Sequence, residues 1–278
     1  MLQRGASRRA DRARGDCHGL NCPSTPPVGI APRRTPAPGR RCPRVRRIQL
    51  SIVIPAHNEE VTVAGVVRGH REVARALASS FELIVCDDGS TDSTWAELQR
   101  SCAEVAELRL LRNPSRLGIP PTMKRLYAEA HGEWIYFTPA DGQVPAAALE
   151  PMWAIRDGTA LVVGRRVPRR DPASRVVIAQ LYSGLLRRIF RLPVHDIDSV
   201  KLYRAEELRS VPPRSESNFF EAEMLITLCT RGRAVREINI PHRPRIAGEA
   251  KGVTPAGALL AMRDVAAFTF RWLLRRDP

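Results

Sequence analysis

Residues 50–59 read LSIVIPAHNE, and residues 81–90 read FELIVCDDGS. Each stretch opens with a short apolar run, which is typical of a buried strand, and closes with polar residues. Between them, residues 59–78 carry valine and leucine among charges at a spacing that predicts an amphipathic helix. Strand, helix and strand in this order form the repeating unit of a parallel sheet.

The same alternation continues along the chain. A helix is expected from Thr91 to about Cys102, with Thr91 as its N-cap, and a strand over 108–111. A helix near 122–130 then leads to a strand over 134–137. The sequence therefore predicts an α/β domain with a mainly parallel sheet flanked by helices.

Polar clusters follow three of the predicted strands, at residues 55–59 (PAHNE), 87–90 (DDGS) and 141–143 (DGQ). In open parallel sheets, ligands bind beyond the carboxyl ends of the strands, so these clusters are candidates for one binding site. The first strand is not followed by G-x-G-x-x-G, and the chain has no G-x-x-x-x-G-K-[ST]. These absences argue against a dinucleotide-binding enzyme and against a P-loop NTPase.

The net charge of +15 on 278 residues is unevenly distributed. Residues 1–47 hold 12 arginines and two aspartates, with seven prolines and five glycines and little apolar periodicity. Such a segment cannot bury enough apolar surface to offset its ordering entropy, so we expect a disordered tail. A basic chain suggests a polyanionic partner, but most of the excess lies in this tail, and we expect no nucleic acid partner.

The cysteines and the apolar segments indicate the compartment. None of the six cysteines forms a C-x-x-C pair, and their spacing matches no zinc site, so a reducing cytoplasm is expected. No stretch of 18 apolar residues is free of charge, because Arg263 and Asp264 interrupt the best one. We therefore expect no transmembrane helix.

SIVIPAHNEE, VCDDGSTD and YFTPADGQ, in this order, resemble the successive motifs of family 2 glycosyltransferases with the GT-A fold. Within that family the chain most resembles the dolichol-phosphate mannose synthase and polyprenyl-phosphate glycosyltransferase group. VVGRRVPRRDPASR, DIDSVKLYR, FFEAEML and PHRPRIAGEAKG extend the resemblance. It implies a Rossmann-like GT-A domain over 48–252, after the tail of 1–47 and before a C-terminal amphipathic helix over 253–278 that can associate with a membrane.

The resemblance implies an enzyme that moves a hexose from a nucleotide-sugar of the GDP-mannose or UDP-glucose type to a polyprenyl phosphate, with inversion. It would act as a peripheral protein at the cytoplasmic face of a membrane. Two alternatives remain open. The acceptor can be a saccharide or glycolipid hydroxyl, or the fold can be a catalytically degenerate binding module.

The resemblance assigns nucleotide-sugar binding to the first two clusters. Pro55, Asn58 and Glu59 would line the nucleotide pocket, and Asp87 and Asp88 would hold the base or ribose, since carboxylates accept hydrogen bonds from N–H and hydroxyl groups. Two structural alternatives stand beside these roles. Glu59 can serve as a carboxylate at a helix N-terminus, and Asp88 can be a turn residue.

The third cluster matches the family's metal motif, D-x-D followed by Gln, only in part. Asp141 and Gln143 supply oxygen ligands that suit Mg²⁺ or Mn²⁺, whereas Pro139 replaces the first aspartate. The metal would neutralise the leaving diphosphate, which makes Asp141 a catalytic residue as well as a metal ligand. Pro139 is also the reason for keeping the degenerate-module alternative.

The basic run GRRVPRRDPASR follows a predicted strand and contains Arg165, Arg166, Arg169, Arg170 and Arg175. Arginine binds phosphate oxygens through its planar fork. The resemblance assigns Arg165 to the donor and Arg175 to catalysis. A solvated face is the alternative for at least half of these arginines.

Later motifs carry three more assignments. Glu223 would be the general base if the acceptor were a hydroxyl, whereas an anionic phosphate acceptor needs no base. Arg245 and Lys251 lie on a loop after the predicted strand 235–240, which the family closes over the donor phosphates. In DIDSVKLYR, Asp196, Asp198 and Lys201 match the family best.

Residues 257–275 predict a helix with Ala261, Val265, Phe268 and Trp272 on one face and arginines beside it. This face can lie in a membrane interface. It can equally pack against the sheet domain or form a dimer contact.

Overall fold

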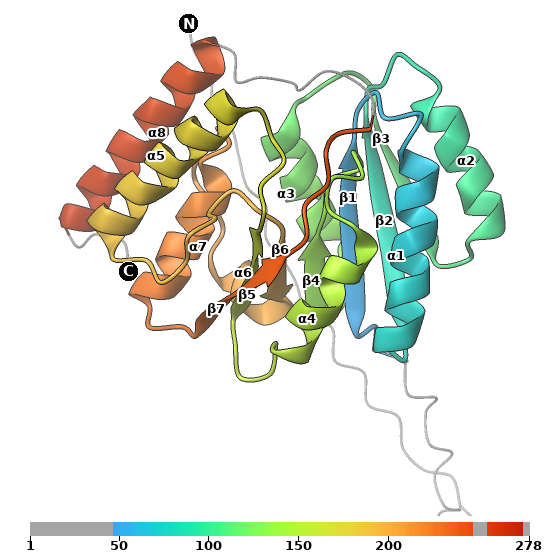
Figure 1. Ribbon diagram of the computed structural model, residues 1–278, viewed down its shortest axis with the longest axis horizontal. Coiled ribbons are helices and arrows are strands. Elements are labelled where there is room, and N and C mark those ends of the chain that lie inside the picture. Colours follow the sequence, from blue (N-terminus) through green and yellow to red (C-terminus); the bar gives the residue numbers. More distant parts are fainter. Residues whose placement is uncertain (1–46, 247–254, 275–278) are drawn as a thin grey trace, which may run out of the picture. The chain divides into compact units, whose positions relative to one another are not determined.

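The computed structural model describes residues 47–246 and 255–274, so the expected tail lies almost wholly outside the described residues. Seven strands form one sheet in the order β3-β2-β1-β4-β6-β5-β7 (Figure 1). The strands are β1 (Leu50–Ala56), β2 (Phe81–Asp88), β3 (Leu108–Asn113), β4 (Trp134–Phe137), β5 (Leu161–Arg166), β6 (Lys201–Arg204) and β7 (Val235–Ile240).

Strand direction decides which loops meet. β1 pairs in parallel with β2 and β4, β2 with β3, and β5 with β7. β6 is antiparallel to both of its neighbours, β4 and β5. The other six strands therefore run in one direction, and their carboxyl ends lie at the same edge as the amino end of β6.

Helices connect the strands on both faces of the sheet (Figure 1). The helices are α1 (Val63–Leu77), α2 (Thr94–Glu104), α3 (Ile119–Glu129), α4 (Leu149–Ala154), α5 (Ala173–Phe190), α6 (Ala205–Ser210), α7 (Phe220–Thr230) and α8 (Pro255–Leu273), with a 3₁₀ turn η1 (Ala146–Ala148) before α4.

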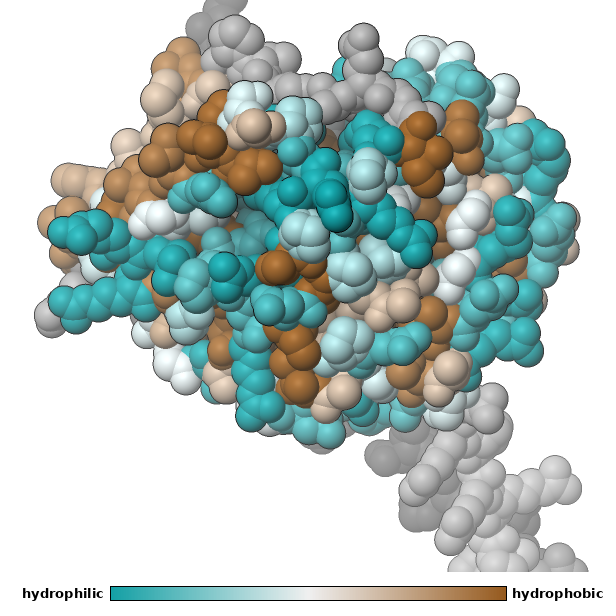
Figure 2. All heavy atoms as spheres, in the orientation of Figure 1, coloured by the Kyte–Doolittle hydropathy of each residue, from teal (hydrophilic) through white to brown (hydrophobic). Residues whose placement is uncertain are grey.

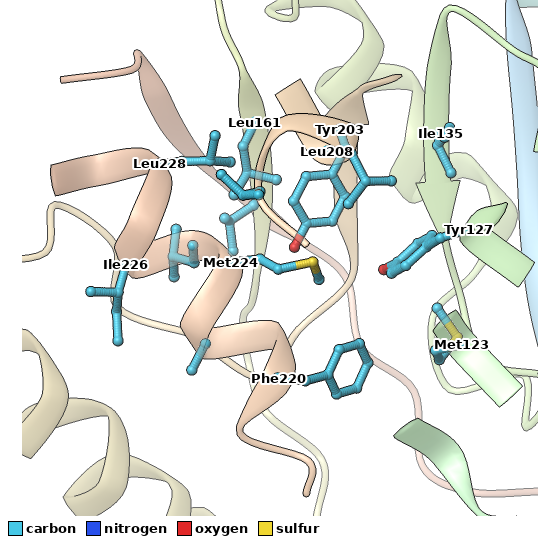
Figure 3. Packing of buried hydrophobic residues seen from close by; sticks show 14 of the residues in the cluster. Met123, Tyr127, Ile135, Leu161, Tyr203, Leu208, Phe220, Met224, Ile226 and Leu228 are labelled. Carbon is cyan, nitrogen blue, oxygen red and sulfur yellow. The ribbon is translucent and has the colours of Figure 1, made fainter. Parts of the chain in front are cut away.

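Alternate residues of each strand face opposite cores, as the two-residue period of a strand requires. In β1, Ile52 and Ile54 join the core under α1, α2 and α4, while Val53 joins the other core. Buried residues of α3, α5, α6, α7 and α8 complete that second core, where Phe220 and Met224 of α7 point toward Tyr203 (Figure 3). α8 is thus packed into the same core as the sheet.

The structure confirms the predicted GT-A-like arrangement of strands and helices up to β4, with helix starts a few residues from those expected. The predicted strand 235–240 is β7. Among the described helices, none is both long and apolar enough to cross a membrane.

Candidate active site

Two loops at the carboxyl ends of β1 and β2 are tied together by hydrogen bonds. The backbone N–H of Asn58 donates to Ser90 Oγ (3.0 Å), and the N–H of Thr91 donates to Asn58 Oδ1 (2.9 Å). Asn58 has a φ of 51°, in the left-handed region that asparagine tolerates. The side chain predicted to line the nucleotide pocket thus fixes the relative position of these two loops.

Asp88 is almost fully buried, and both of its carboxylate oxygens accept hydrogen bonds. The donors are Asn113 Nδ2 (2.8 Å) and the backbone N–H groups of Leu117 (2.9 Å) and Gly118 (2.8 Å). Burial by itself raises the pKa of Asp88, but these hydrogen bonds outweigh burial and lower it. Asp88 therefore holds the entry to α3 in place.

The neighbouring predicted residues are also deeply placed. Asp87 is fully buried, where it accepts hydrogen bonds from the Ser90 N–H (3.1 Å) and from Arg112 Nε (3.1 Å). Pro55 is buried within β1, opposite Cys86 of β2. The backbone and side chains around the DDGS turn thus form a rigid floor at this edge of the sheet.

Three predicted residues from distant parts of the chain meet above this floor. Arg245 Nη2 lies 2.8 Å from Asp141 Oδ2, and Arg245 Nη1 lies 3.4 Å from Glu59 Oε1. Asp141 is further fixed by the Gln143 N–H, which donates to its Oδ1 (3.1 Å). Loops after β1, β4 and β7 therefore bring two carboxylates to one guanidinium, as the shared strand direction allows.

Residues 241–246, here called the strap, carry Arg245 from the edge strand β7 back toward β1 (Figure 1). The Arg243 N–H donates to the Gln143 carbonyl (2.7 Å), and Gln143 Nε2 donates to the Arg243 carbonyl (3.4 Å). Gly142, at φ 69°, lies close to Ile246, since a Cβ at this glycine would be 3.6 Å from Ile246 Cδ1. The strap is thus fastened to the 141–143 turn. Lys251 lies outside the described residues.

The donor set at this position suits a hard divalent cation. The oxygens of Asp141, Glu59 and Gln143 are of the kind that Mg²⁺ and Mn²⁺ prefer, and the Arg245 guanidinium contacts the first two of these side chains. Pro139 contributes no side-chain oxygen. Within residues 47–246 and 255–274, no group of three or more His, Cys, Asp or Glu side chains could hold a metal. The residues fit a metal that also takes ligands from a bound diphosphate.

The basic run divides into two kinds of arginine. Arg166 forms a two-pronged contact with Asp196, from Nε to Oδ2 (2.8 Å) and from Nη2 to Oδ1 (2.7 Å). Arg169 pairs with Asp171 (2.7 Å). Arg165, Arg170 and Arg175, by contrast, are exposed and form no ion pair with any other described residue.

The paired arginines hold the loop 166–171 in place. Burial raises the pKa of Asp196, but the hydrogen bonds from Arg166 outweigh it and lower that pKa. His242 accepts a hydrogen bond from the Arg170 N–H at its Nδ1 (3.0 Å), which connects this loop to the strap. The sequence did not separate Arg166 from Arg165, because only the tertiary structure places Asp196 beside one of them.

Glu223, the predicted base, is buried on α7. Its Oε1 accepts the Arg214 N–H (3.1 Å), and its Oε2 accepts the Ser215 N–H (2.8 Å). Arg271 of α8 lies 3.9 Å from Oε1. Both oxygens are therefore engaged in holding the loop before α7.

A buried polar cluster that was not predicted joins α3, β6 and α7. Glu221 accepts hydrogen bonds from Tyr127 (2.6 Å) and Tyr203 (3.0 Å), and its Oε2 lies 3.1 Å from Lys201 Nζ. Burial, followed by the charge of Glu221, raises the pKa of both tyrosines well above its ordinary value. A lysine between apolar strand residues was the one sequence signal for this cluster.

Two helices expose apolar residues beside each other. Phe190 at the end of α5 stacks edge-on with Phe268 (5.6 Å) and Trp272 (5.1 Å) of α8. Hydrophobic residues gather over α5 and α8 at the upper left of Figure 2. The exposed apolar side chains are Val177, Ile178, Leu181 and Leu185 on α5, and Leu259, Met262, Phe270 and Leu273 on α8.

The C-terminal helix therefore uses its predicted apolar face inside the protein. Phe268 is buried, and Val265 and Trp272 pack against the same core. Asp264, on the same side, accepts hydrogen bonds from the Glu216 (2.9 Å) and Ser217 (3.0 Å) N–H groups. This is the packing alternative for that face, and a different face of α8 is exposed.

Residues 51–210 match the sequence model described as glycosyl transferase family 2, which covers more than half of the chain. This chain belongs to glycosyl transferase family 2. The family and fold predicted from the motifs are confirmed.

Curated relatives of this family 2 chain include transferases named for polyprenyl phosphates. Glycosyltransferase AglD of Haloferax volcanii is 28% identical over 71% of this chain and 34% of its own length. Dodecaprenyl-phosphate galacturonate synthase of Rhizobium johnstonii is 29% identical over 74% of this chain and 62% of its own length. The chain thus spans only part of these two relatives.

Solved structures show the same fold. A crystal structure of glucosyl-3-phosphoglycerate synthase from Mycobacterium tuberculosis, in complex with Mn²⁺, UDP and glucosyl-3-phosphoglycerate, superposes with a TM-score of 0.62. The match covers 80% of each chain at 21% sequence identity. At this identity the likeness establishes the GT-A fold of the family 2 chain.

Proposed function

We propose that this chain transfers a hexose from a nucleoside-diphosphate sugar to a polyprenyl phosphate, with inversion, as a peripheral protein at the cytoplasmic face of a membrane. The observation that carries the proposal is the meeting of Glu59, Asp141 and Arg245 at the carboxyl edge of the sheet. Two carboxylates and a cation at this edge are suited to a metal-bound diphosphate.

The donor would lie over the floor formed by the DDGS turn. Asp87 and Asp88 shape this floor through their internal hydrogen bonds, and Pro55 and Asn58 position the adjoining loop. Asp141 and Gln143, with Glu59 nearby, would hold Mg²⁺ or Mn²⁺, which when bound neutralises the charge that develops on the leaving nucleoside diphosphate. Arg245 and Lys251 would bind the diphosphate from the strap side.

The acceptor phosphate would meet the exposed arginines of the basic run, and we place Arg165 among them, although the resemblance assigns it to the donor. Arg165 is the penultimate residue of β5, at the same edge as Asp141, and the loop after β5 leads through Arg170 to Arg175 in the first turn of α5. Exposed guanidinium groups with no carboxylate partner are available for phosphate oxygens. The acceptor class is supported by relatives that are named for dodecaprenyl phosphate and undecaprenyl phosphate.

The engagement of Glu223 favours a phosphate acceptor over a hydroxyl. A sugar hydroxyl needs a base to remove its proton. A phosphate monoester has a second pKa of about 6, so it is already a nucleophilic dianion at neutral pH. The Glu223 oxygens accept two backbone N–H groups. Glu223 then acts as a positioning residue for the loop before α7.

The exposed faces of α5 and α8 would rest on the bilayer. Leu181 of α5 is 69% exposed and Phe270 of α8 is 65% exposed, and each has further apolar neighbours on the same helix. Arg175 at the start of α5 and Arg188 near its end are exposed to meet anionic headgroups. A lipid-borne phosphate would thereby reach the basic loop from the membrane.

The test uses the full chain with phospholipid vesicles that contain undecaprenyl phosphate, Mn²⁺ and radiolabelled GDP-mannose or UDP-glucose. We expect label in the lipid extract that mild acid releases as free sugar. Vesicles without undecaprenyl phosphate are the matched control. Folded protein that transfers no label to lipid from a panel of nucleotide-sugars would contradict the proposal, and label on a saccharide alone would favour a hydroxyl acceptor.

A further inference from the structure

Arg245 occupies the position in which the donor site would hold a metal ion. Its two terminal nitrogens contact different carboxylates, Nη2 with Asp141 and Nη1 with Glu59. All three side chains are mostly buried, so these contacts are little screened by solvent. A positively charged metal and this guanidinium cannot both face Asp141 Oδ2 at contact distance.

We infer that Arg245 is a resident counter-cation of the donor site, which a divalent metal bound together with a nucleoside diphosphate displaces onto the diphosphate. The inference rests on the proposed function and assigns Arg245 a second role before the donor binds. In the free protein the guanidinium neutralises the two carboxylates. In the loaded protein the same group faces phosphate oxygens.

The strap confines this exchange of partners to the side chain of Arg245. The backbone of Arg243 is bonded to Gln143 in both directions, which anchors the strap two residues before Arg245. His242 bonds the Arg170 backbone and provides a second anchor. Arg245 can therefore change partners by rotating its own side chain, without release of β7 or of the 141–143 turn.

Pro139 gives the exchange its importance, because it offers no oxygen ligand beside Asp141. A site with so few carboxylates binds a bare metal ion weakly, and competition from Arg245 lowers that affinity further. A bound diphosphate takes the Arg245 guanidinium away from Asp141 and supplies further oxygen ligands to the metal. Metal and nucleotide should then each strengthen the binding of the other, as linkage requires.

The experiment compares Arg245→Gln with wild type by Mn²⁺ titration, followed by electron paramagnetic resonance, without nucleotide. Charge-assisted hydrogen bonds of this kind correspond to roughly tenfold or more in an equilibrium constant. We therefore expect Arg245→Gln to bind Mn²⁺ alone about tenfold more tightly than wild type. Mn²⁺ affinity in Arg245→Gln that equals or falls below wild type would overturn the inference.

Two further variants separate contact from net charge. Arg243→Gln removes an exposed arginine from the same strap and leaves its backbone bonds, so its Mn²⁺ affinity should match wild type. Arg245→Lys keeps the charge but has one nitrogen, and it should fall between wild type and Arg245→Gln. An equal gain in Arg243→Gln would mean that charge alone is responsible and would overturn the inference.

The titration is repeated with UDP and with GDP. Saturating nucleotide should raise the Mn²⁺ affinity of wild type by a larger factor than that of Arg245→Gln, because only wild type has a competitor to lose. If neither nucleotide binds wild type with Mn²⁺, the proposed donor class fails. The Mn²⁺-alone comparison still decides the role of Arg245 in that case.

Discussion

Two regions of this protein differ in whether their charged side chains have partners within the protein and in whether their apolar side chains are exposed. On the nucleotide side, around the loops after β1, β2 and β4, carboxylates such as Asp87, Asp88 and Asp141 all have partners within the protein. On the helix side, formed by the 165–175 loop with α5 and α8, Arg165, Arg170 and Arg175 have no carboxylate partner among the described residues, and apolar side chains face outward.

This contrast fits the two ligands of the proposed function. A small charged donor is bound best by groups that are already oriented, since little reorganisation is then required. The proposed lipid acceptor would supply its own apolar surface and phosphate, which the exposed groups of the helix side match. Each side can be tested by separate changes to the protein.

Asp141→Asn should have the largest effect, because it removes a charge from the proposed metal and diphosphate position. We expect kcat/KM for sugar transfer to fall by about 100- to 1000-fold. Steady-state transfer to undecaprenyl phosphate measures it. Asp157→Asn, at an exposed aspartate, is the control. An equal fall of kcat/KM in Asp157→Asn would mean that the loss of activity does not come from the proposed metal and diphosphate position.

Acid should destabilise the folded protein through His70 of α1. Burial lowers the pKa of His70 to about 4, against the carbonyl contact with Val66, which raises it. Between pH 6.5 and pH 4 the unfolded chain takes up a proton that the folded chain excludes, so stability falls as pH falls. The expected loss is about 3 kcal/mol in the free energy of unfolding.

Urea unfolding at pH 7 and pH 4 measures this loss, and His70→Asn should show much less of it. His131 is exposed, so His131→Asn should retain the wild-type loss. If His70→Asn and wild type lose the same stability between pH 7 and pH 4, His70 does not account for the acid sensitivity of the protein.

Charges on α5 should weaken membrane binding without changing the donor site. Leu181→Glu combined with Leu185→Glu places two carboxylates on the exposed face, where each leucine would bury apolar surface in the bilayer. We expect about tenfold or greater loss of affinity for anionic vesicles in sedimentation, at unchanged thermal stability. Val61→Glu, an equally exposed position on the nucleotide side, should bind vesicles like wild type.

Glu223→Gln should have the smallest effect. Glutamine keeps one acceptor oxygen for the loop before α7 but sets an amide against the second N–H, which costs about 1 kcal/mol of stability. Because a phosphate acceptor needs no base, transfer should change by less than about threefold. Loss of turnover by orders of magnitude, with a shifted pH profile, would instead identify Glu223 as a base.

Much of this arrangement was predictable from local sequence. The apolar runs of β1 and β2 and the polar residues that end them indicate a parallel sheet with a site at one edge, because strand period and strand polarity are local properties. The motif order identified the family, which the sequence match confirms. The sequence also brought Glu59, Asp141 and Arg245 forward as members of one donor site.

Which charged and apolar groups already have partners within the protein depends on its tertiary structure. Arg165 and Arg166 are neighbours in sequence, yet Asp196 pairs with Arg166, and at 3.8 Å with Arg169, but not with Arg165. Phe268 lies on the predicted apolar face of α8, but that face packs into the core and leaves Phe270 exposed. A side chain's partner depends on elements tens of residues away, so its availability for a ligand follows from packing and not from its local pattern.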